Sequence, residues 1–596
     1  MSYRAPIREI IFALDDVVAL DGLREYARFS DCDGDTTRAV LDAAGTFAAD
    51  VLAPLNRTGD VEGARLEKGC VRAPSGFAAA YGKYVEGGWG ALSASTSFGG
   101  QGLPRAIDLA VFEMIHAANM AFGLCPMLTR GAIEALTVHG TDRQKGIYLP
   151  KLVSGEWSGT MNLTEPQAGS DLGSLRARAE PAGDGRYRLS GQKIFITWGD
   201  HDMAENIVHL VLARLPNAPE GTRGISLFLV PKRLVGDDGK PGAANSLGPS
   251  GIEHKLGIRG SATCTMVFDA AEGELIGAPH QGLALMFTMM NAARLQVGVQ
   301  GVAIAERAYQ QALAYALERR QGRSAWTGEL SAPIFDHPDV RRMLMLMKAK
   351  IEAARAICLT TAVAADLADC AETEEERTVA KLKEEFFTPV AKAWSTEIGV
   401  EIASLALQVQ GGAGYIEETG AAQHYRDARI APIYEGTNGI QAIDLMGRKL
   451  ALENGAAVRN LLDEIWPCVG RLKANENAWL HSVGARLEAA AGAAQAASSW
   501  MVERRGHAQP DALAGATAYL KLMGDLLGGY MLAKGALIAS ERMAKEDDAD
   551  LWWRTRIGLA RIFSDQVLAQ APGLTAGVTA GAIDLLRTSP AALGSA

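Results

Sequence analysis

The chain has 596 residues, which is too many for one hydrophobic core and suggests about three to four modules of roughly 150 residues each. With 48% hydrophobic and 21% charged residues it has the composition of an ordinary globular protein, which excludes a disordered or fibrous chain. The formal net charge of −10 argues against a nucleic-acid partner, because such a partner requires clustered lysine and arginine.

The first segment, residues 1–37, is an N-terminal extension whose role the sequence does not disclose. Its start does not resemble a signal peptide, because Asp15 and Asp16 interrupt the short apolar run. No uncharged apolar stretch of the chain approaches the ~18 residues that cross a bilayer. We therefore expect no integral membrane segment.

Residues from about 38 to 155 show helical periodicity. The clearest runs, at 36–51 and 106–118, are separated by turns that carry glycine and proline. Between these runs the glycine-rich residues 98–102 read as a loop. This part of the chain is therefore expected to form an N-terminal helical domain.

The period changes to two between about 156 and 281, which is typical of β-strands. Turn clusters at 184–185 and 219–221 separate the alternating runs. We expect antiparallel strands in a small barrel or sandwich. The alternating apolar residues are Tyr187, Leu189, Ile194, Ile196, Val208, Leu210, Leu212, Ile225, Leu227 and Leu229.

Helical periodicity returns at 282 and continues to 455 as a C-terminal bundle. Pro338 occupies a first-turn position and opens a long helix. One face of that helix is an apolar stripe, which we interpret as core rather than as a cofactor site. The stripe consists of Val340, Leu344, Met347, Ile351, Ala354 and Cys358.

A further segment, 456–596, is alanine-rich and helical, and it carries equal numbers of basic and acidic residues. It is therefore no basic patch for nucleic acid. We expect it to pack against the body of the protein or a partner subunit, with membrane docking through an amphipathic face as the weaker alternative.

The seven cysteines form no Cys-x-x-Cys pair, and their number is odd. We interpret them as reduced, mostly buried thiols of a cytoplasmic protein. The ten histidines show no His-Glu-x-x-His spacing, so the sequence predicts no metal site.

Residues 433–441 place a single carboxylate, Glu435, in a tight turn. Ile433 and Tyr434 are expected to shield it from water on one side, and Gly436 lets the backbone turn sharply. A desolvated carboxylate has a raised pKa, which suits a general base. The alternative for such a glutamate alone is a solvated loop residue.

Two further stretches bear on this choice: residues 161–171, Met-Asn-Leu-Thr-Glu-Pro-Gln-Ala-Gly-Ser-Asp, and residues 191–199, Gly-Gln-Lys-Ile-Phe-Ile-Thr-Trp-Gly. Together with 433–441 they resemble the acyl-CoA dehydrogenase family, flavoproteins that oxidise the α,β bond of an acyl-CoA thioester. Residues 253–261 also resemble the family. The motifs occur in family order and spacing, and the resemblance covers about residues 40 to 455.

The resemblance implies an α+β fold with an N-terminal helical domain, a central antiparallel β domain and a C-terminal helical bundle, followed here by an extra helical extension. The expected boundaries are 1–37 for the N-terminal extension, 38–155, 156–281, 282–455 for the bundle with the catalytic base, and 456–596 for the C-terminal extension.

The resemblance also implies FAD as cofactor. In 161–171 a hydroxyl from Thr164 and a backbone group from Leu163 suit the polar edge of a flavin, Gly169 lets the backbone approach, and Ser170 can bind the pyrophosphate or ribityl chain. Met161 matches a further contact. No Gly-x-Gly-x-x-Gly follows a predicted strand, so a Rossmann site is not supported.

On the second motif, Phe195 and Thr197 match the family positions where an aromatic ring covers the flavin and a hydroxyl meets its N5 edge. Phe195 alone would be an ordinary strand aromatic. In the family the adenosine half of FAD crosses a subunit interface, so the resemblance implies at least a homodimer. The residues that match these positions are Arg319, Gln408, Gly411 and Gly412, and Thr437 matches a further FAD contact.

Two departures affect the adenosine side. Gly439 stands where many members carry glutamine, and the Phe-Gly common after the arginine segment is shortened to Gly322. These departures concern the details of adenine binding and not FAD itself.

The family chemistry assigns Glu435 the removal of the α-proton, after which a hydride passes from the β-carbon to flavin N5. The backbone N–H of Glu435 and a ribityl hydroxyl would stabilise the enolate. Substrate contacts are expected from Ser170, Tyr434, Glu435 and Gly436. Arg294 is either a CoA-side residue or an exposed helix-start arginine, and the loop 98–102 is either a simple turn or a wall of the acyl pocket.

The resemblance extends to two groups of long members, bacterial fatty acyl-CoA dehydrogenases of β-oxidation and 3-methylmercaptopropionyl-CoA dehydrogenases of dimethylsulfoniopropionate breakdown. We favour a medium- or broad-chain acyl-CoA and keep the sulfur substrate as the alternative. An electron-transferring flavoprotein is the expected electron acceptor. An acyl-CoA oxidase and a non-enzymatic, DNA-associated relative are the remaining hypotheses.

Overall fold

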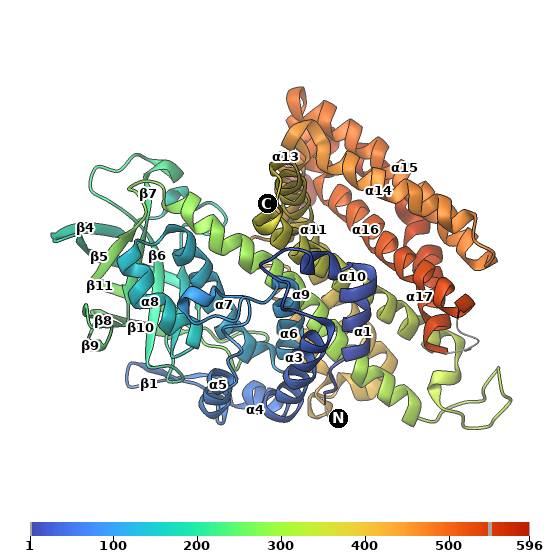
Figure 1. The fold of residues 1–596 in the computed structure, drawn as a ribbon, viewed down its shortest axis with the longest axis horizontal. Coiled ribbons are helices and arrows are strands. Elements are labelled where there is room, and N and C mark those ends of the chain that lie inside the picture. Colours follow the sequence, from blue (N-terminus) through green and yellow to red (C-terminus); the bar gives the residue numbers. More distant parts are fainter. Residues whose placement is uncertain (1–2, 546–550, 595–596) are drawn as a thin grey trace. The chain divides into compact units, whose positions relative to one another are not determined.

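The computed structural model describes residues 3–545 and 551–594, and the chain divides into two compact units (Figure 1). The first unit comprises residues 1–5 and 32–296, and the second comprises residues 6–31 and 297–596. The fold is α+β, with a helical N-terminal part, a central β domain and a helical C-terminal part that the extension enlarges.

Six helices of the first unit, α3 to α8, precede the strands of its β domain. The predicted run 106–118 is confirmed as α6, and α7 behind it is buried along most of its length. The predicted run 36–51 is also helical, but it continues through a π-helical stretch, Ala48–Leu52, into the next helix. The helices are α3 (Gly34–Phe47), α4 (Ala53–Glu62), α5 (Phe77–Glu86), α6 (Arg105–Ala118), α7 (Met120–His139) and α8 (Asp142–Ser154).

Of the two expected architectures, a barrel and a sandwich, the β domain forms the barrel. Its pairings run β11–β5–β4–β6–β7 and back to β11, while β3 pairs with β6 and β10 with β11. The strands are β3 (Trp157–Asn162), β4 (Arg178–Gly183), β5 (Arg186–Thr197), β6 (Asn206–Arg214), β7 (Ile225–Pro231), β10 (Leu247–Ile252) and β11 (Thr263–Ile276). Two short hairpins accompany them, β1 (Arg65–Glu67) with β2 (Cys70–Arg72), and β8 (Arg233–Val235) with β9 (Pro241–Ala244).

The expectation of antiparallel strands needs one correction. β6 runs parallel to β3 and, over one residue pair, parallel to β4, whereas the other pairings are antiparallel. β6 and β7 are buried on both faces, so their side-chain alternation carried no information about strand direction.

The bundle of the second unit consists of long helices. Pro338 occupies the first turn of α10 as predicted, and the stripe from Leu344 to Cys358 is buried. The helices are α9 (Gly282–Glu318), of which residues up to 296 belong to the first unit, then α10 (Pro338–Cys370), α11 (Glu374–Gln410), α12 (Ala421–Ala428) and α13 (Asn438–Gly447).

The C-terminal extension is helical, as predicted, and packs against the bundle through α16, which contacts α10, α11 and α13. Figure 1 shows α14 to α17 side by side in orange and red. The helices are α14 (Ala456–Lys473), α15 (Ala478–His507), α16 (Gln509–Lys545), α17 (Leu551–Gln566), α18 (Ala571–Thr579) and α19 (Ile583–Arg587). Among the described residues, one segment, Gln509–Ala544, has the length and apolarity of a membrane span, but 89% of its most apolar window is buried within the protein.

The N-terminal extension packs on the second unit through α1 (Ile7–Ile11), a π-helical stretch and α2 (Asp21–Arg24). Glu9 forms an ion pair with Lys348 of α10 at 3.2 Å, and the Phe12 ring meets the edge of Trp552 in α17, with 5.1 Å between centroids. The segment whose role the sequence left open therefore joins the bundle to the C-terminal extension.

Candidate active site

The end of β3 leads into a loop, and together they carry five of the predicted flavin contacts. Met161 is buried near the end of the strand, and Leu163 and Thr164 follow where the strand ends. Strand β5 holds this loop: the Ile194 amide donates to the Thr164 carbonyl at 2.9 Å, and Lys193 Nζ donates to the Leu163 carbonyl at 3.0 Å. The groups that the loop can offer a ligand are thus the Leu163 N–H and the Thr164 hydroxyl.

A buried ion pair organises the same loop, and its role was not predicted from the sequence. Lys193 Nζ donates to Glu165 at 2.8 Å, and the two side chains are 0% and 4% exposed. Glu165 also accepts the backbone N–H groups of Arg176 and Ala177 at 2.6 and 3.0 Å. Burial alone would raise the pKa of Glu165, but Lys193 and these two amides outweigh it and hold that pKa below its usual value.

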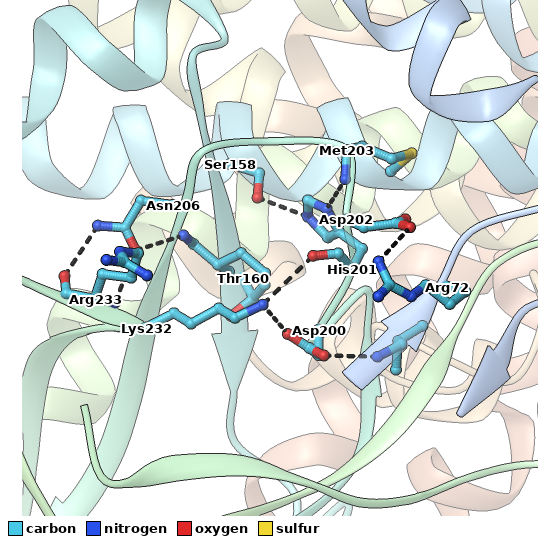
Figure 2. A network of polar contacts seen from close by, with 12 residues as sticks. Arg72, Ser158, Thr160, Asp200, His201, Asp202, Met203, Asn206, Lys232 and Arg233 are labelled. Carbon is cyan, nitrogen blue, oxygen red and sulfur yellow. Dashed lines mark hydrogen bonds and ion pairs between the residues drawn. The ribbon is translucent and has the colours of Figure 1, made fainter. Parts of the chain in front are cut away.

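The opposite face of β3 is anchored by a polar network (Figure 2). His201 Nδ1 accepts the Met203 amide at 3.2 Å, so its Nε2 carries the proton and donates to the Ser158 hydroxyl at 2.8 Å. Burial lowers the pKa of His201 to about 3, which keeps the ring neutral. Beside it, Asp200 accepts from Lys232, as Figure 2 shows. The strand that delivers Met161 is therefore fixed from behind.

Phe195 lies at an irregularity of β5, where the pairing with β11 shifts register. Its φ of 60° is left-handed, which is uncommon for an aromatic residue, and its side chain is 59% exposed. A bulge of this kind re-aims a side chain, so Phe195 is not the ordinary strand aromatic that its position alone suggests. Thr197, two residues on, is half-buried.

Gly169 and Ser170 are exposed in the loop after Thr164, and an added Cβ at Gly169 would meet no atom within 4 Å. The chain's own packing therefore does not require glycine there, which agrees with room for a ligand. The loop 98–102 is different. Gly99 has a φ of 85°, and an added Cβ at Gly100 would collide with Ala94, so the turn itself accounts for these glycines.

Glu435 lies in a bend directly before α13, in the second unit. Glu435 and Gly436 both have left-handed backbones, with φ of 56° and 81°. For a residue with a side chain this conformation costs about 1–2 kcal/mol and persists only where the surroundings fix it, as they often do at functional sites. The Gln441 amide contributes by donating to the Glu435 carbonyl at 3.3 Å.

The residues before this bend have different environments. The Tyr434 hydroxyl donates to Gln300 of α9, and burial, together with the nearby Glu435 carboxylate, raises the pKa of Tyr434. Ile433 is 48% exposed, so it is only partly covered itself.

Arg294 is neither exposed nor at a helix start. It lies within α9, is buried, and donates to Asn291 Oδ1 at 3.2 Å. The alternative of an exposed helix-start arginine is thereby contradicted.

The predicted adenosine-side residues Arg319, Gln408, Gly411 and Gly412 are exposed in the second unit. Gly411 ends α11 with a φ of 58°, which requires glycine, whereas an added Cβ at Gly412 would meet nothing within 4 Å. Thr437 caps α13 by accepting the Ile440 amide at 3.2 Å. Gly411 and Thr437 are therefore explained by the fold itself, whereas the fold does not explain the identity of the residues at the other three positions.

The comparisons with known proteins agree with these motifs. Models of the acyl-CoA dehydrogenase N-terminal, middle and C-terminal domains match residues 34–156, 160–271 and 280–451, and an acetyl-CoA dehydrogenase C-terminal-like model matches 461–589. A 3-methylmercaptopropionyl-CoA dehydrogenase of Ruegeria pomeroyi is 47% identical over 99% of this chain and 100% of its own length. The chain belongs to the acyl-CoA dehydrogenase family.

A second relative of this acyl-CoA dehydrogenase is the broad-specificity linear acyl-CoA dehydrogenase FadE5 of Mycobacterium tuberculosis, 33% identical over 95% of both chains. Two solved structures share the fold: Caenorhabditis elegans ACDH-11 in complex with C11-CoA (TM-score 0.77, 22% identity, 95% and 92% coverage) and a Bacillus anthracis acyl-CoA dehydrogenase complexed with FAD (0.73, 19%, 96% and 92%). The chain is an FAD-dependent dehydrogenase of acyl-CoA thioesters.

The residues present fit a flavin. An exposed aromatic ring held in a left-handed backbone, the Thr164 hydroxyl on a fixed loop, and glycines with open space at 169 and 412 are features that a bound FAD would explain. Among the described residues no group of three histidine, cysteine or acidic side chains is arranged to hold a metal ion.

Proposed function

We propose that Glu435 is the base that removes the α-proton of the acyl-CoA. The observation that carries the proposal is the backbone of this residue: a glutamate is held in a left-handed conformation by a hydrogen-bonded bend. A left-handed backbone is uncommon for a glutamate and persists only where the surroundings fix it, and a base must be fixed in direction.

We propose the FAD contacts that the family motifs imply, for each unit by itself. In the first unit we propose contacts from Met161, Leu163, Thr164, Gly169, Ser170, Phe195 and Thr197, and in the second from Arg319, Gln408, Gly411, Gly412 and Thr437. When bound, the flavin supplies the acceptor for the hydride of the β-carbon.

The protein's own contribution is to acidify and orient the substrate. The Glu435 N–H would donate to the thioester carbonyl and stabilise the enolate as its own carboxylate takes the α-proton. Tyr434, Gly436 and Ser170 would line the thioester, with Arg294 on the CoA side.

Two substrate classes have support. The similarity to the broad-specificity linear acyl-CoA dehydrogenase favours medium- or broad-chain thioesters of β-oxidation. The second candidate, 3-methylmercaptopropionyl-CoA, is favoured by the 47% identity to a dehydrogenase of that name over its full length.

The remaining assignments rest on the family. We propose an electron-transferring flavoprotein as electron acceptor, a homodimer whose shared FAD sites use the exposed residues around 411, and a cytoplasmic location in keeping with seven free cysteines. The proposed domain boundaries remain 37, 155, 281 and 455.

The test is Glu435→Gln, which keeps the size of the side chain and removes the base. We expect kcat to fall by at least ~10²–10⁴-fold while FAD stays bound. Glu435→Asp, which shortens the reach by one methylene, should retain a measurable part of the activity. Activity like that of the wild type in Glu435→Gln would overturn the assignment.

The substrate is decided by anaerobic bleaching of the bound flavin with a panel of straight-chain and methylthio acyl-CoA thioesters, followed by turnover with an artificial electron acceptor. Hydrogen peroxide measured during turnover in air distinguishes a dehydrogenase from an oxidase.

A further inference from the structure

A fully buried lysine lies against the Glu435 bend. Lys392, in the middle of α11, is 0% exposed. Its Nζ donates to the Gly436 carbonyl and to Asn438 Oδ1, both at 2.8 Å. Burying an ammonium is unfavourable unless it is hydrogen-bonded, and here two of its hydrogen bonds go to the residues that directly follow the base.

The accepting end of this contact lies in a segment with an uncommon backbone. The Gly436 carbonyl comes just after two consecutive left-handed residues, 435 and 436. Gln441 donates to the same carbonyl at 3.4 Å, but from within the next helix, whereas Lys392 reaches it from a different one. Lys392 thus joins the bend to a second helix of the bundle.

Asn438 adds further hydrogen bonds between the bend and α11. Besides accepting from Lys392, its amide donates to Thr396 Oγ1 at 3.1 Å, to the Ala393 carbonyl at 3.2 Å and to Glu397 at 2.8 Å. Lys392 and Thr396, which lie one turn apart on α11, therefore both hydrogen-bond to the bend.

The other face of α11 makes a separate contact. Trp394, two residues and so about 200° from Lys392 around the helix, donates from Nε1 to Asp525 of α16 at 2.9 Å. The helix is fixed on one face by the C-terminal extension and holds the bend with the other.

We propose that Lys392 is a positioning residue for Glu435: by holding the Gly436 carbonyl and Asn438, it keeps the preceding carboxylate directed at the α-proton. The inference rests on the proposed role of Glu435. Without Lys392 the bend can relax toward an ordinary backbone, and a displacement of about 1 Å at the base can cost ~10²-fold in rate.

The experiment compares Lys392→Met with the wild type, both as holoenzymes. We expect kcat to fall by ~10²-fold while FAD content and KM for the acyl-CoA change less than about threefold. Exchange of the substrate α-protons in D2O, measured anaerobically by mass spectrometry, should slow by a similar factor, because it reports proton removal alone.

Trp394→Phe is the matched control on the same helix. It removes the hydrogen bond to Asp525 and should lower the melting temperature without slowing α-proton exchange more than about threefold. The inference is overturned if Lys392→Met keeps kcat within threefold of the wild type. It is also overturned if that variant loses FAD and substrate affinity together with kcat, as a general loss of structure would.

If Lys392→Met does not fold, Asn438→Ala decides, because it removes the partner and keeps the lysine. A loss of kcat at unchanged FAD content supports the inference, and an unchanged kcat overturns it. Glu435→Gln separates the two hypotheses: an inactive Glu435→Gln beside an active Lys392→Met refutes only the positioning role, whereas an active Glu435→Gln refutes the base.

Discussion

Replacing Lys193 by methionine tests whether the buried ion pair builds the flavin loop. The change removes the ammonium that donates to Glu165 and to the Leu163 carbonyl, while the side chain keeps its approximate length. Glu165 keeps its two backbone donors but loses its positive partner. The loop at 163–165 therefore contains a buried carboxylate without its counter-charge.

The expected cost follows from the burial of both groups. Breaking a buried pair by removing one partner costs about 3–5 kcal/mol. At roughly 2–4 °C per kcal/mol for a unit of this size, the melting temperature should fall by about 6–20 °C. The variant should also lose FAD more readily, because the Leu163 and Thr164 backbone is no longer fixed.

The effect should depend on pH with a defined sign. In the wild type the pKa of Glu165 is lowered, so its stabilisation is present above its unfolded value and lost as pH falls through the folded one. Without Lys193, burial should raise this pKa, so the folded variant binds the proton more tightly than the unfolded chain does. The difference in melting temperature between the two proteins should therefore be smaller at pH 5.5 than at pH 7.5.

The assay is thermal unfolding followed by tryptophan and released-flavin fluorescence. Lys151→Met serves as the control, because its ion pair with Glu156 is 36% and 45% exposed and should contribute less than ~1 kcal/mol. Equal melting temperatures and equal flavin occupancy in the two variants would refute the reasoning.

Two further predictions concern stability. Burial lowers the pKa of four histidines to about 3, so below pH 6.5 the unfolded chain binds protons that the folded chain does not. The free energy of unfolding should therefore fall by up to about 1.4 kcal/mol per histidine and pH unit. A melting temperature that stays constant from pH 7 to 5 would contradict this. The four are His116, His201, His209 and His424. Gly524→Ala should destabilise α16 by about 1–3 kcal/mol, because the added methyl would collide with the Trp394 ring. Gly492→Ala has open space around it and should stabilise α15 by up to about 1 kcal/mol. If the two variants shift the midpoint of chemical denaturation in the same direction, the packing argument is contradicted.

The elements that the sequence predicted are those in which local pattern and burial coincide. Helix α10 begins at Pro338 and buries most of its apolar stripe, because a stripe with helical spacing has only one way to face a core. The direction of β6 could not be predicted, since a strand buried on both faces looks the same in either orientation. The strands themselves could be predicted, but neither the choice of a barrel over a sandwich nor the parallel pairing could.

The sequence suggests candidate site residues where a single residue carries the chemistry, and it does not reveal the pairs that hold them. Glu435 stands out because of the turn around it. Glu165 and Lys193 both lie inside the motifs, but the sequence does not indicate that they form an ion pair, because that contact depends on β5 lying beside the loop. Lys392 is farther still from the residue that it serves, so only the fold reveals it.

The proposed role of Lys392 suggests what the C-terminal extension contributes. A base held in an unfavourable backbone needs a support that does not yield, and α11 supplies that support only if its other face is also fixed. That face is fixed mainly by packing, in which the Trp394 ring meets Phe563 of α17. The hydrogen bond from Nε1 to the buried Asp525 is a smaller part of this contact, so Trp394→Phe should leave the face packed whereas loss of the whole extension should not. A chain cut at residue 455 would leave this indole exposed and α11 held on one side, so we expect the extension to affect turnover through the stiffness of the helix that carries Lys392, without any contact to the substrate.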